Sequence, residues 1–88
     1  MEQTIKARHI TIVKSIENKK NGLFTEHVYK VCLDDLEVLR AMRDIEKEYK
    51  ENEEFEILHG LTEWLSLGFR NNRTGAEVRF RADGWPLE

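Results

Sequence analysis

The chain contains one cysteine, Cys32, so no disulfide can form within it. A zinc site built mainly from cysteines is excluded for the same reason. No apolar run exceeds three residues, whereas a helix needs about 20 apolar residues to span a bilayer, so we expect no membrane contact. The first residues also lack the apolar stretch of a signal peptide. These absences predict a cytoplasmic protein.

Sequence motifs that carry chemistry are missing as well. The glycines are scattered, and the chain has no phosphate-binding loop, no Gly-x-Gly-x-x-Gly and no Gly-x-Ser-x-Gly. His9, His27 and His59 form no His-x-x-His or His-x-x-x-His pair, so we expect no metal site. We predict no catalytic residue, no cofactor and no enzymatic activity.

Cys32 is the one side chain whose type suggests a nucleophile. It lies between Val31 and Leu33 in a predicted strand, and a catalytic thiol would need a neighbouring base and a lowered pKa. His27 is five residues away on the same strand, so its side chain should point to the opposite face. We expect Cys32 to be a small buried hydrophobic residue.

The composition is that of one small folded domain. We expect all 88 residues, 1–88, to form it. Hydrophobic residues make up 40% and charged residues 35%, which predicts a thin core beneath a strongly charged surface. Four Phe, two Trp and two Tyr provide large side chains for that core, so the composition argues against disorder.

The net charge of −3 conceals an uneven distribution along the chain. Residues 1–33 carry a net charge of +3, residues 34–63 carry −7, and residues 64–88 carry +1. The chain therefore has an acidic centre between two mildly basic ends, which makes charged surfaces the first candidates for binding.

Two strands are predicted at the start, over residues 4–18 and 23–33, because β-branched and aromatic residues dominate there. Asn21-Gly22 between them is a strong hairpin signal, since both residues tolerate positive φ. A two-residue turn at Asn21-Gly22 would place Ile12 opposite Val31. A longer loop over residues 18–22 would place Ile12 opposite Val28, and we favour the first register.

A helix is predicted over residues 35–50, with an acidic N-cap at Asp34-Asp35. Apolar residues recur at helical spacing and should form one buried stripe, consisting of Val38, Met42, Ile45 and Tyr49. The opposite side carries oppositely charged pairs at i,i+4 spacing, which suits a solvated face.

A second helix is predicted over residues 53–67. Its apolar residues would share one face, and they are Ile57, Leu58, Leu61, Trp64 and Leu65. Gly60 weakens the helix and Gly68 could end it. The alternative is a strand over residues 55–59.

Residues 76–82 alternate between apolar and charged side chains, which predicts a half-buried strand after a loop at 71–75. The predicted fold class is therefore α+β with the order ββααβ, an antiparallel three-stranded sheet with two helices packed on one face. The other face of the sheet would be exposed and would carry Arg79 and Arg81. Trp85 would cover an edge of the core.

With catalysis disfavoured, we expect a small protein-binding regulator or inhibitor that acts by occupying a surface of a macromolecular partner, most simply another protein. The acidic stretch is the predicted contact, because acidic patches dock basic surfaces. Its residues are Glu46, Glu48, Glu51, Glu53, Glu54 and Glu56.

Two alternatives remain open from the sequence. One is a nucleic-acid-binding module, because arginine suits phosphate, although the isoelectric point of about 5.6 is low for such a domain. Its contacts would be Arg8, Lys14, Arg70, Arg73, Arg79 and Arg81. The other alternative is a homodimer in which an edge strand or the helix pairs with its copy.

Overall fold

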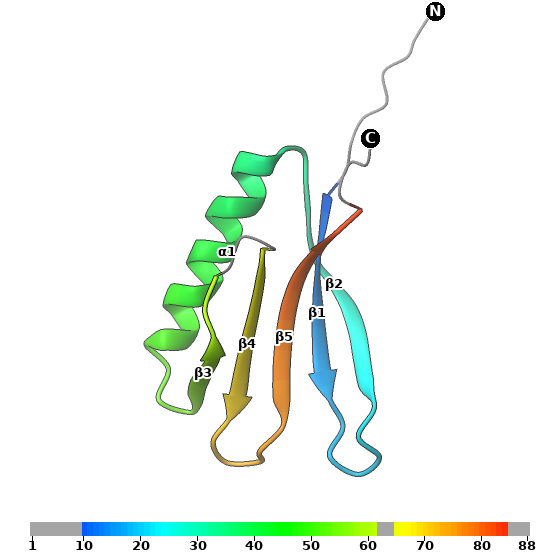
Figure 1. Cartoon of the computed structure of the whole chain (residues 1–88), viewed down its shortest axis with the longest axis vertical. Helices are drawn as coiled ribbons and strands as arrows, with labels where there is room; N and C mark the ends of the chain where they lie inside the picture. The colour runs from blue at the N-terminus through cyan, green and yellow to red at the C-terminus, as the bar shows by residue number, and fades with distance from the viewer. Residues whose placement is uncertain (1–9, 62–64, 85–88) are drawn as a thin grey trace, which may run out of the picture.

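The computed structural model describes residues 10–61 and 65–84, which form one sheet and one helix (Figure 1). In chain order the elements are β1 (Ile10–Glu17), β2 (Phe24–Cys32), α1 (Asp35–Lys50), β3 (Phe55–His59), β4 (Ser66–Asn71) and β5 (Glu77–Asp83). The sheet is antiparallel throughout, in the strand order β2-β1-β5-β4-β3. α1 connects the two edge strands and covers one face of the sheet. No helix in these two ranges is long and apolar enough to cross a membrane.

The predicted three-stranded sheet with two helices is wrong, because the sheet has five strands and the described chain has one helix. Residues 53–67 do not form the second helix. The alternative prediction, a strand over residues 55–59, is confirmed as β3. The end of the range belongs to a further strand, because β4 begins at Ser66. The order of elements is therefore ββαβββ, and a single helix covers the sheet.

The apolar residues that suggested the second helix are not gathered on one face. Ile57 lies opposite the buried Phe69 of β4, whereas Leu58 lines the other side of the sheet. Leu65 has a positive φ of 54°, which a helix does not contain. Leu67 and Phe69 are fully buried in β4. Neither residue belonged to the apolar face of the predicted helix, so the strand buries two large side chains that the helix would not have buried. Trp64 lies outside the described residues.

Both predicted hairpin registers are also wrong near the turn. Asn18 and Leu23 are the last paired residues of the two strands, so the loop between them has four residues. This loop length places Lys14 opposite His27, a pair that neither predicted register contains. The carbonyl of Asn18 accepts hydrogen bonds from the N–H groups of Asn21 and Gly22, at 3.3 and 2.7 Å. Gly22 has a φ of 74°, as the Asn-Gly signal requires, but within a longer loop.

A β-bulge shifts the register a second time. The partner of Ile12 is Lys30 and the partner of Val13 is Val28, so Tyr29 is the extra residue of β2. Beyond the bulge Ile10 lies opposite Cys32. A register derived from the turn alone cannot locate such an insertion, because the bulge depends on packing rather than on the loop.

The predicted helix over residues 35–50 is confirmed, and so is its cap. Oδ1 of Asp34 accepts the N–H of Glu37 at 2.8 Å, and Oε1 of Glu37 accepts the N–H of Leu33 at 2.9 Å. The two carboxylates together satisfy donors at the positive end of the helix. Val38, Met42 and Ile45 are buried as predicted.

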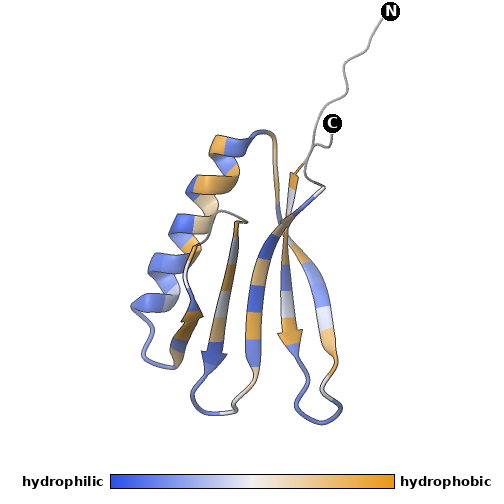
Figure 2. Cartoon of the chain, in the orientation of Figure 1, coloured by the Kyte–Doolittle hydropathy of each residue, from blue (hydrophilic) through white to orange (hydrophobic). Residues whose placement is uncertain are grey.

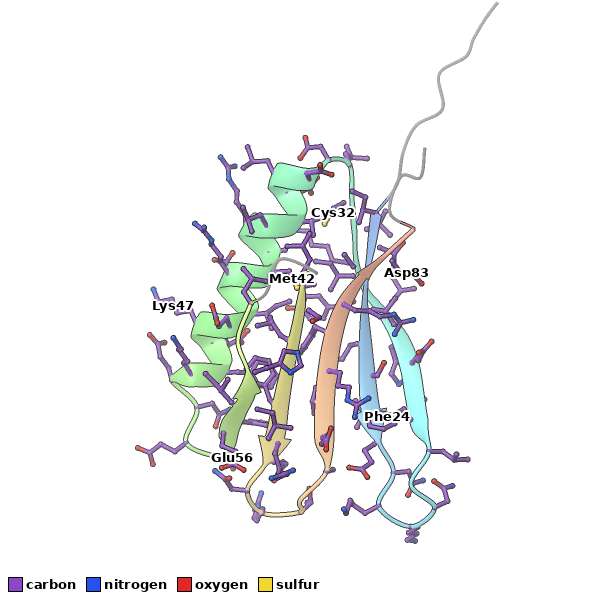
Figure 3. All side chains as sticks on the ribbon, in the orientation of Figure 1. Phe24, Cys32, Met42, Lys47, Glu56 and Asp83 are labelled. Carbon is purple, nitrogen blue, oxygen red and sulfur yellow. The ribbon has the colours of Figure 1, made fainter. Side chains whose placement is uncertain are left out.

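The core lies between α1 and the sheet, where Figure 3 shows Cys32 and Met42. Its aromatic centre is Phe69, whose ring stacks on Tyr49 of α1 with 4.4 Å between centroids. Phe80 of β5 meets Tyr49 edge-on at 5.6 Å. Burial raises the pKa of the Tyr49 hydroxyl, and the nearby Glu48 carboxylate adds to the effect.

The strand predicted over residues 76–82 is confirmed as β5, Glu77–Asp83. Apolar and charged residues alternate along it (Figure 2). Val78 and Phe80 are buried toward α1, so Arg79 and Arg81 point to the opposite side. That side, here called the helix-free face, is where the predicted arginine pair lies. Trp85 is outside the described residues.

Candidate functional site

A groove of about 510 Å³ lies on the helix-free face. Its size falls in the range of natural ligand and side-chain pockets, roughly 300 to 1,000 Å³. All five strands contribute to its lining, which consists of Ser15, Phe24, Glu26, Leu58, His59, Ser66, Leu67, Gly68, Glu77, Arg79, Phe80 and Arg81. Strands that are far apart in the sequence therefore build it together.

The register explains the hollow. One row of cross-strand neighbours runs over all five strands, in the order His59, Gly68, Arg79, Ser15 and Glu26. Gly68 and Ser15 have the smallest side chains of this row, and both are buried. Gly68 and Ser15 flank Arg79 on the central strands, and the larger His59 and Glu26 lie at the two edges, so the surface is hollow where the two small residues lie.

Arg79 is held in a fixed position at the centre of the groove. Its Nε and Nη2 donate to Oε1 of Glu77, at 3.2 and 2.9 Å. Its guanidinium carbon lies 4.4 Å from the centroid of the Phe24 ring, which is a cation–π contact. The two contacts favour one orientation of the guanidinium, although the side chain is 54% exposed.

Arg81 forms the second basic point of the groove. Its Nη1 donates to Oε2 of Glu26 at 3.0 Å and lies 3.5 Å from Oγ of Ser15, and its Nη2 is 3.6 Å from Asp83. Ser15 is 5% exposed although it is on the face that α1 does not cover, because the arginine layer lies over it. The arginines thus shield the central strands as well as carrying charge.

The charges of the groove are balanced. Glu77 forms an ion pair with Arg79, and Glu26 forms one with Arg81. Arg70 lies at the rim, 3.8 Å from Glu77 and 3.3 Å from Glu56. Most of these side chains are well exposed, so each pair contributes little to folding. Their effect is to present alternating positive and negative groups to whatever approaches the face.

His59 and Gly68 form the opposite end of the groove. A Cβ on Gly68 would lie 2.6 Å from Cε1 of the His59 ring, so the imidazole occupies the space above the glycine. Nε2 of His59 is 3.4 Å from Oγ of Ser66, within hydrogen-bonding distance. The absence of a side chain at Gly68 therefore fixes where the His59 ring lies.

The Gly68→Ala variant is expected to displace the exposed His59 ring and to lower the unfolding free energy by no more than about 1 kcal/mol, because the ring can move aside into solvent. The double variant Gly68→Ala with His59→Ala should regain most of this loss, because the ring that clashes is gone. Urea unfolding of the four proteins of this cycle measures the coupling. Equal losses in both His59 backgrounds would show that His59 does not lie over Gly68.

The acidic residues predicted as a contact do not form one surface. Oε2 of Glu46 accepts the N–H of Leu61 at 3.1 Å and so joins α1 to the chain after β3. Glu56 is on the helix-free face beside Arg70 (Figure 3). The described residues contain a single helix, so there is no junction of two helices among them for these residues to line.

The remaining acids lie around the end of α1. Glu51 is its C-cap, and Glu48, Glu51 and Glu53 are exposed. Glu54 forms an ion pair with Arg73 at 3.6 Å. Four of the six predicted contact residues thus stay together in one exposed acidic turn, with Glu46 and Glu56 elsewhere.

The basic residues predicted for nucleic acid are divided as well. Lys14 is on the helix side, with its Nζ 5.8 Å from the centroid of the Phe80 ring, and Arg73 is in the turn between β4 and β5. Arg70, Arg79 and Arg81 share the helix-free face, and each is within 4 Å of a carboxylate. Arg8 lies outside the described residues.

Cys32 is buried in the core, as predicted. Its burial raises the pKa of the thiol, and the Glu37 carboxylate raises it further, so the thiolate is disfavoured. The described stretches contain no group of three or more His, Cys, Asp and Glu residues that could hold a metal ion.

Sequence analysis had singled out the arginines and Glu56 on the helix-free face but not the groove. Three residues of the groove were missed. Phe24 was assigned to an ordinary strand, His59 to a helix, and Gly68 to the C-terminal end of that helix. A small residue inside a strand, as Gly68 proves to be, is a known sign of a close approach. No protein-family model, curated protein or solved structure was found to match this chain.

Proposed function

We propose that this chain is a protein-binding regulator without enzymatic activity, which occupies a surface of a partner protein through its helix-free face. The groove at Arg79 carries the proposal: it is a concave, charge-alternating site spanning all five strands. Arginine and aromatic residues that are already held in place are the side chains that most often dominate protein interfaces.

The balance of charge favours a protein over a nucleic acid. A phosphate backbone would meet Glu26 and Glu77 along with Arg79 and Arg81, and like charges repel. A protein surface can offer a carboxylate to the arginines and a basic group to the glutamates at the same time. A partner loop or side chain that enters the groove would therefore find both signs of charge matched.

The Arg79→Ala variant is expected to bind the partner about 30-fold more weakly, because we expect Arg79 to be a hot spot and the loss of a hot-spot residue costs about 2 kcal/mol or more. The partner is first captured with the intact chain from the cells that make it and is then purified. Isothermal titration calorimetry then gives the Kd of each variant.

Two control variants make the comparison specific. Arg73→Ala removes an arginine from the turn outside the groove, and the triple reversal Glu51→Lys, Glu53→Lys and Glu54→Lys changes the acidic turn. Both should bind as the unaltered chain does. Full binding by Arg79→Ala with weak binding by the triple reversal would move the contact to the acidic turn. Tight, salt-dependent binding of duplex or single-stranded DNA would instead support a nucleic-acid-binding module.

A further inference from the structure

The strand β2 forms an edge of the sheet. It has nine residues and is hydrogen-bonded to β1 along one side, and its other side meets no strand in the described part of the chain. An edge strand presents a row of N–H and C=O groups with which another strand can pair. The backbone of β2 is thus a template for an additional strand.

Exposed apolar side chains gather at the same edge. Five of the eight large hydrophobic residues that are exposed in the described ranges lie on β2 or directly next to its ends, namely Leu23, Val28, Tyr29, Val31 and Leu33. Val28 is 66% exposed and Val31 is 51% exposed, and both are on the helix-free face. A soluble surface gains by covering such a strip.

The other edge of the sheet is less suited to an additional strand. β3 has five residues, and its exposed apolar side chains, Ile57 and Leu58, are less accessible at 37% and 38%. α1 also contacts β3 more extensively than it contacts β2. Of the two edges, β2 offers the longer backbone and the larger apolar surface.

One charge on β2 has no counterpart among residues 10–61 and 65–84. Lys30 is exposed, and no carboxylate of the described residues lies within 4 Å of its ammonium group, whereas Glu26 is engaged by Arg81. A strand alongside β2 that carries a carboxylate near Lys30 would supply the missing charge. This charge, together with the apolar strip, defines the chemistry of the segment that fits.

We propose that β2 binds an extended segment of a partner protein as a sixth strand, with β-branched side chains beside Val28 and Val31 and a carboxylate beside Lys30. This is recognition by β-strand addition, in which the backbone supplies affinity and alternate side chains supply specificity. The edge of β2 adjoins the groove at Arg79, because Phe24 and Glu26 of this strand also line the groove. The inference nevertheless rests on the strand edge, the exposed valines and Lys30, and not on the proposed function.

A second copy of the chain fits this edge less well. Antiparallel pairing of two β2 strands centred on Glu26 or on Lys30 places like charges opposite each other. Pairing centred on Val28 brings Glu26 opposite Lys30, but the bulge directs these two side chains to different faces. A partner segment of different sequence has no such conflict.

The test uses a phage-displayed library of random short peptides, selected on the full chain. We expect enriched peptides with β-branched residues at alternating positions and one acidic residue. Binding of a synthesised peptide should weaken about tenfold in the double variant Val28→Glu with Val31→Glu, as the loss of two cross-strand pairs predicts. Lys30→Glu should also weaken it, and a peptide with its acid replaced by lysine should restore binding to that variant.

The matched control is Lys20→Glu, which reverses a lysine in the exposed hairpin loop and should leave binding unchanged. Arg73→Ala, in the turn between β4 and β5, should do the same. Hydrogen exchange gives a second readout: the bound peptide should protect every second amide of β2, those directed away from β1. This measurement uses the unaltered chain, so it remains valid even if one of the variants does not fold.

Three results would overturn the inference. They are a selection that enriches no peptide, a bound peptide that protects the amides of β3 or the groove instead of β2, and a free chain that sediments as a dimer until Val28 is replaced. The last result would assign the edge to a second copy.

Discussion

The Phe69→Ala variant is expected to lose about 3 to 5 kcal/mol of unfolding free energy, the usual cost of removing a buried phenylalanine side chain. Phe69 is fully buried, and its ring stacks on Tyr49 and meets Phe80 edge-on. Because small domains are stable by only about 5 to 15 kcal/mol in total, this loss should leave a large unfolded fraction. Urea unfolding followed by circular dichroism measures it.

Phe24→Ala is the matched control. Phe24 is partly exposed on the helix-free face, where its main contact is the guanidinium of Arg79. Its removal should cost about 1 kcal/mol, since little apolar area leaves water there. If both variants lost the same small amount, Phe69 would not be at the centre of the core, and the pairing of β4 with β5 beneath α1 would be wrong.

The second large effect concerns the reactivity of Cys32. In the folded chain this thiol should react with a soluble disulfide reagent at least about 100-fold more slowly than in urea, because an opening that costs about 3 kcal/mol must come first. The thiol is 0% exposed, and its burial raises its pKa. Phe69→Ala should accelerate the reaction, since the opening then costs less.

The pH dependence of stability provides an independent check on Cys32. A raised pKa in the folded chain means that the thiol favours folding below the unfolded-state pKa of about 8.5, and that this contribution is lost as the pH rises through the folded-state value. The unfolding free energy should therefore decline more steeply above pH 8.5 in the unaltered chain than in Cys32→Ala. A native thiol that reacts as fast as free cysteine, with no difference in pH slope, would show that Cys32 is not buried.

Local sequence signals predicted the elements whose side chains have one clear partner surface. The helix at Asp35–Lys50 has an N-cap and a stripe of apolar residues, and both signals depend only on near neighbours. The strand at Glu77–Asp83 alternates cleanly, because one of its sides packs on α1 and the other faces water. These two elements could be located without knowing the rest of the fold.

The prediction of a helix over residues 53–67 was wrong because the apolar residues there fit both the period of a helix and that of a strand. Ile57 and Leu58 are adjacent, so they suit one face of a helix and equally both sides of a strand. The pairing of β3 with β4 decides between them, and this pairing depends on β5 and β1, which are distant or later in the chain. Tertiary structure therefore overrides the local pattern here.

The candidate site was only partly predictable for a similar reason. Alternation alone placed Arg79 and Arg81 on the exposed side of their strand, and the structure agrees. The groove itself depends on register, which aligns Gly68 with Arg79 and Ser15 with Glu26. The longer hairpin loop sets the register of Ser15 against Glu26, and the turn closed by Asn71 and Ala76 sets that of Gly68 against Arg79. The loop length cannot be deduced from the strand sequences.

The strand order has a consequence for how the chain could be divided. β1, β2 and α1 are consecutive in the sequence, as are β3, β4 and β5, and the pairing of β1 with β5 joins the two groups within the sheet. Neither group can cover its apolar surface alone, because Phe69 and Phe80 come from one and α1 from the other. Cutting the exposed turn at Asn52 should therefore yield two fragments that are unfolded when separate and that regenerate the sheet when mixed.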